Sequence, residues 1–182
     1  MDDTDRPGFP WPWLLPSLAV LLGLTAWGIG VYPELPERVP QHVGPDGVDA
    51  WTDKSVGAVF LPVFLYAGVT VVMTAVCAAA PRIRPADELD PGERTSGLVN
   101  RPATRVSALR TGRAVLLTNA LIGLLIALSC TVMWRTEPAS HVPGWFPVVL
   151  LAVGSASVVP VLVAAVRDRR DRRGRRGHPR RG

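Results

Sequence analysis

The sequence predicts an all-α integral membrane protein with four transmembrane helices. Four stretches contain no Asp, Glu, Lys, Arg or His, and these are residues 13–33, 55–81, 114–134 and 142–166. About 20 helical residues, each rising about 1.5 Å, are enough to cross the ~30 Å hydrocarbon core of a bilayer. Unbroken apolarity also leaves no polar face for water, which argues against the alternative of a soluble four-helix bundle.

The first helix is expected to stay in the mature protein. Residues 1–12 form a short tail that carries Asp2, Asp3 and Asp5 but only Arg6. A secretory signal peptide would show the reverse charge there, followed by a small-residue cleavage site. We therefore favour an uncleaved first span over a cleaved signal peptide, and we treat residues 13–80 as a two-helix membrane module.

The distribution of basic residues predicts the orientation. Residues 81–113 contain seven arginines, and the tail at 167–182 is rich in arginine, whereas the loop at 34–54 has two basic residues against five acidic ones. Positively charged loops are retained in the cytoplasm. Both termini and the linker 81–113 are thus predicted to be cytoplasmic, and the loop 34–54 extracytoplasmic. Aromatic residues near the expected outer interface agree, namely Trp27, Tyr32, Trp51, Trp134 and Trp145.

The basic segments have expected partners of their own. The pI of about 10.2 would suggest nucleic acid for a soluble protein, but topology accounts for this charge, so nucleic acid is an unfavoured partner. The linker 81–113 and the tail 167–182 are expected to contact anionic lipids of the bilayer. Residues 104–110 are expected to form a short interfacial helix before the second transmembrane helix pair, 114–166. The tail is too polar to bury a core and is predicted to be disordered.

One motif stands between the first two spans. It reads Leu35-Pro36-Glu37-Arg38-Val39-Pro40-Gln41-His42 and continues with Gly47, Asp49, Trp51 and Lys54, which is the chain's single lysine. Prolines fix φ and favour extended neighbours, and the Asp-Gly pair at 46 and 47 favours a turn. The loop 34–54 is therefore predicted to be structured and folded over the outer ends of the helices.

This motif resembles the N-terminal module of the SdpI-type immunity-protein family, bacterial membrane proteins with the domain of unknown function 1648. The resemblance implies a multi-pass protein of the bacterial inner membrane that serves binding, immunity or signalling. Its outer loop and the mouth of the helices would engage a peptide, a toxin or a partner protein. The binding residues that it suggests are Pro36, Pro40, His42, Gly47, Asp49 and Lys54.

From the sequence we expect neither an enzymatic activity nor a bound cofactor. It contains no His-Glu-x-x-His, no Gly-x-Ser-x-Gly, no P-loop and no pair of intramembrane carboxylates. A metal site built from His42 with Asp46, Asp49 or Asp53 stays chemically open, but a single imidazole among loop carboxylates is a weak ligand set. We expect no catalytic residue and no metal ligand.

The alternative function is that of a small transporter or a permease accessory subunit. Asn119 is the most polar residue within the four spans, and it either lines a substrate path or joins helices. Ion and proton pathways usually include an ionisable group, and none lies within the spans, so the binding hypothesis is favoured. Small residues four apart, such as Gly123 and Ala127, also permit a homo-oligomer.

Two contacts can be predicted from the antiparallel path. Cys77 lies near the inner end of its span and Cys130 near the outer end of its own, so the two thiols should not form a disulfide. Lys54 directly precedes the second span, where its ammonium group is expected to attract Asp49 or Asp53 of the same loop.

Overall fold

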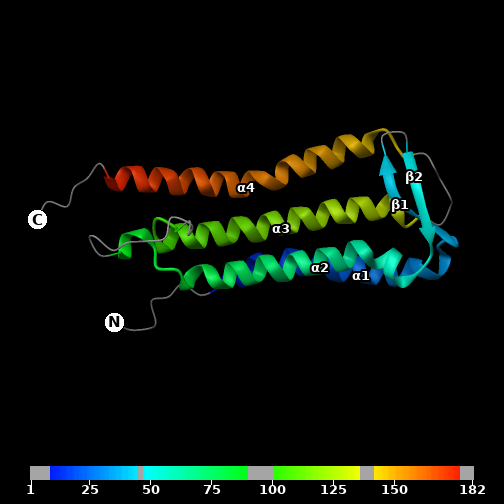
Figure 1. Ribbon diagram of the computed structural model, residues 1–182, viewed down its shortest axis with the longest axis horizontal. Coiled ribbons are helices and arrows are strands. Elements are labelled where there is room, and N and C mark those ends of the chain that lie inside the picture. Colours follow the sequence, from blue (N-terminus) through cyan, green and yellow to red (C-terminus); the bar gives the residue numbers. More distant parts are fainter. Residues whose placement is uncertain (1–8, 45–46, 90–100, 136–141, 177–182) are drawn as a thin grey trace, which may run out of the picture.

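Four long helices run alongside one another, with a small hairpin at one end (Figure 1). The computed structural model describes residues 9–44, 47–89, 101–135 and 142–176. The helices are α1 (Leu15–Val31), α2 (Val56–Ala79), α3 (Arg105–Met133) and α4 (Trp145–Arg176). Each is long and apolar enough to cross a membrane, which fits the predicted multi-pass protein in contact with a lipid bilayer.

Side-chain caps begin two of the helices. The hydroxyl of Ser55 accepts a hydrogen bond from the backbone N–H of Ala58 at 3.1 Å, and that of Thr104 accepts one from Ser107 at 3.0 Å. Such caps satisfy amide groups that have no partner within the helix. Because α3 begins at Arg105, the short helix predicted at 104–110 is its first two turns and is continuous with the span.

Helix α3 holds the other helices together. It packs against α1, α2 and α4, whereas α4 packs chiefly against α3. The buried residues Leu116, Asn119, Gly123 and Cys130 recur at helical spacing along α3 and form its stripe of contact with α1 and α2. The interior of the fold is therefore a three-helix core with a fourth helix on one side.

A polar contact joins the three core helices, near the middle of α2 and α3 and in the first turn of α1. Asn119 has no exposed surface, and its amide nitrogen donates hydrogen bonds to the hydroxyl oxygens of Ser17 at 2.9 Å and Thr70 at 3.0 Å. These partners lie on α1 and α2 respectively. With no water available in a bilayer core, polar groups must find such internal partners. Asn119 therefore fixes the three helices in one register.

A close aromatic contact lies one turn away. Tyr66 of α2 is 1% exposed, and its hydroxyl group donates to the carbonyl oxygen of Ser17 at 3.4 Å. A Cβ atom placed on Gly123 would lie 2.3 Å from both Cζ and the hydroxyl oxygen of Tyr66. The tyrosine ring therefore occupies the space that a side chain on residue 123 would need.

The end of the fold opposite the hairpin is an ordered set of ion pairs. Arg105 pairs with Glu88, Arg110 with Asp171 at 3.2 Å, and Arg172 with Asp168 at 2.8 Å. The predicted boundary between α4 and a disordered tail at residue 167 differs from the structure, since α4 continues through Arg176. Contacts with α3 and with residues 101–103 give these turns partners that composition does not reveal. The remaining tail, 177–182, and residues 90–100 of the linker lie outside the described residues.

Asp168 is the centre of this group, just beyond the charge-free stretch 142–166. Burial raises the pKa of its carboxyl group, but hydrogen bonds from the Ser107 hydroxyl, the Ala103 backbone N–H and Arg172 outweigh burial and leave the pKa below its ordinary value. The Ala103 bond measures 2.8 Å. Asp168 thus ties the C-terminal turns of α4 to the start of α3.

Both cysteines are free and buried, as predicted. Cys77 packs with Leu14 and Leu116, whereas Cys130 belongs to a separate apolar cluster with Trp134. The two thiols thus lie in different parts of the core.

The packing of Tyr66 on Gly123 leads to a test with a matched control. Gly123→Ala should lower the free energy of unfolding by about 1–3 kcal/mol, because Tyr66 must leave its position. Gly112→Ala on the same helix has no atom within 4 Å of the new Cβ and should be neutral or slightly stabilising. Thermal unfolding of both variants in detergent measures the difference. Equal melting temperatures would contradict the role given to this contact.

Candidate functional site: the hairpin at the ends of the helices

The loop between α1 and α2 folds as a β-hairpin. Strand β1 (Arg38–Gly44) pairs antiparallel with β2 (Gly47–Asp53), with irregular register on either side of His42. The hairpin lies at the end of the molecule where α1 and α3 end and α2 and α4 begin (Figure 1). The expectation of an all-α chain with a structured loop therefore needs a correction, because backbone pairing between the two strands supplies the structure of this loop.

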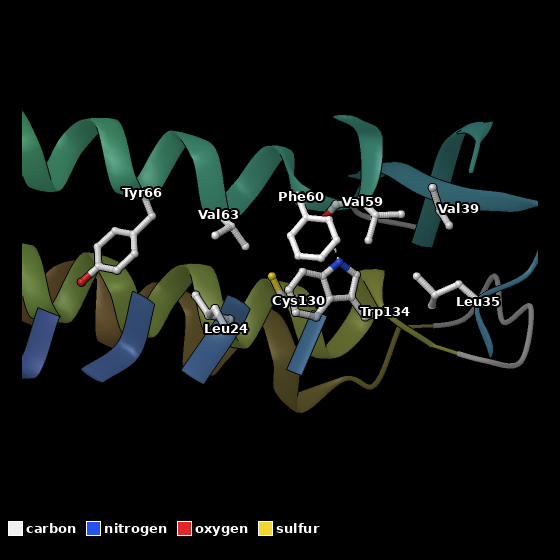
Figure 2. Close-up of a cluster of buried hydrophobic side chains, with 9 residues drawn as sticks. All are labelled: Leu24, Leu35, Val39, Val59, Phe60, Val63, Tyr66, Cys130 and Trp134. Carbon is white, nitrogen blue, oxygen red and sulfur yellow. Dashed lines mark hydrogen bonds between the residues drawn. The ribbon is translucent and has the colours of Figure 1, made fainter. Parts of the chain in front are cut away.

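Apolar residues of the motif attach the hairpin to the helices. Leu35 is 4% exposed and Val39 is 3% exposed, and both belong to a buried cluster with Val59, Phe60 and Trp134 (Figure 2). At about 25 cal/mol per Å² of apolar surface, burying two such side chains contributes on the order of 3 kcal/mol. Strand β1, which contacts α2 and α3, is therefore held against the helix ends.

Trp134 forms the floor under the hairpin. It lies just after α3, its indole N–H donates to the carbonyl oxygen of Val59 at 3.0 Å, and its side chain is buried. A Cβ on Gly28 would approach the Trp134 ring to 3.0 Å, so α1 needs a glycine at this point. The sequence placed Trp134 among interfacial aromatics, but the structure buries it because the hairpin covers the end of α3.

Lys54, which directly follows β2, links the base of the hairpin to the segment that follows α1. Its ammonium group donates hydrogen bonds to the carbonyl oxygens of Leu35 at 2.7 Å and Tyr32 at 3.5 Å, and it lies 5.4 Å from the centre of the Tyr32 ring. Carbonyl groups after the end of a helix lack partners, which makes them natural acceptors for a cation. In the described part of the chain these bonds replace the predicted attraction to Asp49 or Asp53.

His42 and Asp49 form an exposed pair near the tip of the hairpin. The His42 Nδ1 and Asp49 Oδ1 atoms are 2.6 Å apart, and the two side chains are 68% and 56% exposed. Asp49 lies five residues before Lys54 along β2, which corresponds to about 17 Å of extended chain. The structure therefore brings His42 and Asp49 together but separates both from Lys54.

The remaining motif residues shape the hairpin. Pro36 is half-buried before β1, and Pro40 is buried opposite Trp51. Gly47 has a φ of 126°, a backbone conformation that side chains disfavour, and it begins β2 opposite Gly44. Asp46 lies outside the described residues. Pro36, Pro40 and Gly47 thus determine the backbone shape of the hairpin. Of the suggested binding residues, those with exposed polar side chains are His42 and Asp49.

The site offers hydrogen bonding and charge. Within the described ranges, no three His, Cys, Asp or Glu side chains gather into a set that could hold a metal ion. Asp53, one of the residues considered as a ligand, pairs across the hairpin with Arg38, whereas His42 pairs with Ala50 nearer the tip. What the hairpin presents is an imidazole, a carboxylate and a strand edge.

Asn119 lies apart from this site, within the helices. Both amide protons already have partners on α1 and α2, which is the arrangement expected for a contact that joins helices. Ser17 could not be recognised from the sequence as one of these partners. Its position in the first turn of α1 was visible in the sequence, but the helix face on which it lies was not.

The fold and this site define a multi-pass membrane protein that carries a hairpin between its first two spans. Residues 11–66 match the family model of a domain of unknown function, DUF1648. The match covers α1, the hairpin and the first part of α2, and it supports the resemblance of the motif to the domain of unknown function 1648. No curated protein and no solved structure matches the chain.

The bonds of Lys54 predict a local effect on the hairpin. Lys54→Met keeps an apolar stem but removes the donor, so amide groups in β1 and β2 should exchange about fivefold faster, which corresponds to about 1 kcal/mol. Hydrogen exchange followed by mass spectrometry measures this rate. Gln41→Ala serves as the control and should leave the exchange unchanged, since its side chain is exposed. Unaltered exchange in Lys54→Met would show that the apolar contacts suffice to hold the hairpin.

Proposed function

We propose that this chain is a bacterial inner-membrane protein that uses the hairpin to bind an extracytoplasmic peptide or protein partner. The SdpI-like motif suggests immunity or signalling as the process that this binding serves. The observation that carries the proposal is the exposed His42–Asp49 pair on a hairpin whose opposite end is held to the helices. In this proposal the chain acts by binding and not as an enzyme.

Among the described residues, the hairpin pairs with no third strand. In a two-stranded sheet each strand leaves one row of backbone N–H and C=O groups without a strand partner, and extended peptides add to such edges. Strand β1 contacts α2 and α3, so β2 presents the more accessible edge. A peptide paired with β2 would run beside Asp49, and side chains near it would give specificity.

The attachment of the hairpin to the helices also favours binding of a partner. Leu35, Val39 and Lys54 fix the base of the hairpin before any partner arrives. A preformed site loses less conformational entropy on binding than a flexible loop. The charges of His42 and Asp49 contribute partner choice and association rate more than affinity, because charge patterns discriminate between partners even at exposed positions.

Charge distribution supports the orientation in this proposal. The arginines of residues 101–113 and 167–176 lie at the end of the helices opposite the hairpin (Figure 1). Positively charged segments are generally retained in the cytoplasm, so in this proposal both termini lie inside and the hairpin lies outside.

The orientation can be tested by cysteine labelling in intact cells. In a Cys77→Ala, Cys130→Ala background, Gln41→Cys in the hairpin should react with an impermeant thiol reagent, because residue 41 is exposed. Arg169→Cys at the other end should react only after lysis. The reverse pattern would overturn the proposed topology, as would a reporter fused after Gly182 that is active only outside the cell.

The binding role can be tested by site-specific photo-crosslinking in the native host. A photoreactive residue at Thr52 of β2 should yield a defined adduct with a partner, and the same residue at Val106, exposed at the other end, should not. His42→Ala combined with Asp49→Ala should reduce the adduct at least about tenfold. Gln41→Ala, an exposed neighbour, is the matched control and should retain it.

Protein amount in the membrane is measured for every variant, so that loss of binding is separated from loss of folding. An adduct of equal yield with and without the His42–Asp49 pair would remove the pair from the binding site. Absence of any adduct that depends on the hairpin would overturn the proposal itself.

A further inference from the structure

A cleft opens on the side of α3 at the arginine-rich end of the molecule. It has a volume of about 550 Å³, and its lining comes from α3, α4 and Trp13, which lies just before α1. The cleft follows from the packing, because α4 leans chiefly on α3 and leaves a space toward α1. Its volume lies within the ~300–1,000 Å³ of typical ligand sites.

The walls are apolar over a length that suits one lipid chain. On α4 the lining includes Ala156, Pro160 and Val163, and Leu117 faces them from α3. From Arg167 to Ala156 the helix rises about 16 Å, at about 1.5 Å per residue. One leaflet contributes about half of the ~30 Å hydrocarbon core. The cleft thus extends from headgroup level to about the middle of a bilayer.

Arginines line one end of the cleft. Arg110, Arg113 and Arg167 all contribute to the lining. Arg110 is paired with Asp171 at 3.2 Å, whereas Arg113 and Arg167 are exposed and make no ion pair within the described residues. Two guanidinium groups at the mouth of an apolar cleft match an anionic headgroup attached to an acyl chain, since guanidinium binds phosphate through paired hydrogen bonds.

We propose that this cleft binds one anionic phospholipid, with an acyl chain along α4 and its phosphate on Arg113 and Arg167. The occupant is a lipid because the walls that lie below the arginines are apolar through one leaflet. A free phosphate would use the arginines but not the walls. A second copy of the chain could occupy the cleft only if it placed an acidic side chain against the arginines and an apolar side chain against the walls, at the same depth in the bilayer.

The test is native mass spectrometry of the purified full chain in an uncharged detergent. Phosphatidylglycerol and phosphatidylcholine with identical chains are titrated separately. The wild-type protein should retain one phosphatidylglycerol at concentrations at least about tenfold below those needed for phosphatidylcholine. This comparison needs no variant, so folding cannot confound it. Glycerol 1-phosphate, which lacks the chains, should fail to displace the lipid.

Paired variants then locate the site. Arg113→Gln with Arg167→Gln should weaken phosphatidylglycerol binding at least about tenfold, whereas Arg169→Gln with Arg173→Gln, equal in charge change but outside the cleft lining, should not. Ala156→Phe should block both lipids. Ala165→Phe, half a helical turn round α4 at about 100° per residue, is its control.

Several outcomes would overturn the proposal. Equal retention of the two lipids would remove the role of charge, and equal losses in the two arginine pairs would indicate general attraction to a basic surface. Displacement by glycerol 1-phosphate at the lipid's own concentration would show that the apolar walls are unused. A lipid-free dimer that the Ala156→Phe change dissolves would assign the cleft to a second copy.

Discussion

Close packing of α1 and α2 on one face of α3 is the constraint on which the rest of the structure depends. Asn119 permits one register, in which Ser17 and Thr70 both accept its amide protons. Gly123 permits one separation, in which the Tyr66 ring lies against the backbone of α3. In a bilayer the hydrophobic effect does not distinguish helix from lipid, so such close contacts and internal hydrogen bonds decide which helices associate.

The hairpin depends on this arrangement. Because α1 and α3 end and α2 begins beside the hairpin, Val59, Phe60 and Trp134 form an apolar cluster with Leu35 and Val39 (Figure 2). Lys54 then uses the carbonyl groups at the end of α1 to hold the strand that leads into α2. The exposed His42–Asp49 pair is thereby presented on a fixed support, which is the physical basis for the binding role that we propose.

The two ends of the molecule differ in chemistry as well as in charge. One end is a short sheet that exposes an imidazole and a carboxylate. The other end carries arginines that form ion pairs with Glu88, Asp168 and Asp171. Arg113 and Arg167 line the apolar cleft there and make no ion pair within the described residues. The cleft depends on the position of α4, because a helix that packs chiefly on α3 leaves a space that a more compact bundle would fill.

The sequence by itself determined the four spans, their order and the location of the motif. Absence of charge over about 20 residues is a local property, so it can be recognised without knowledge of the fold. The sequence also separated Cys77 from Cys130, since span order alone places them at opposite ends.

The tertiary structure decided which face of each helix is buried, because an entirely apolar helix shows no periodic pattern from which to infer it. It also paired Asp168 with groups 61 to 65 residues away, turned Lys54 from a carboxylate partner into a backbone donor, and buried Trp134. Those outcomes depend on contacts between distant segments, which local composition does not encode.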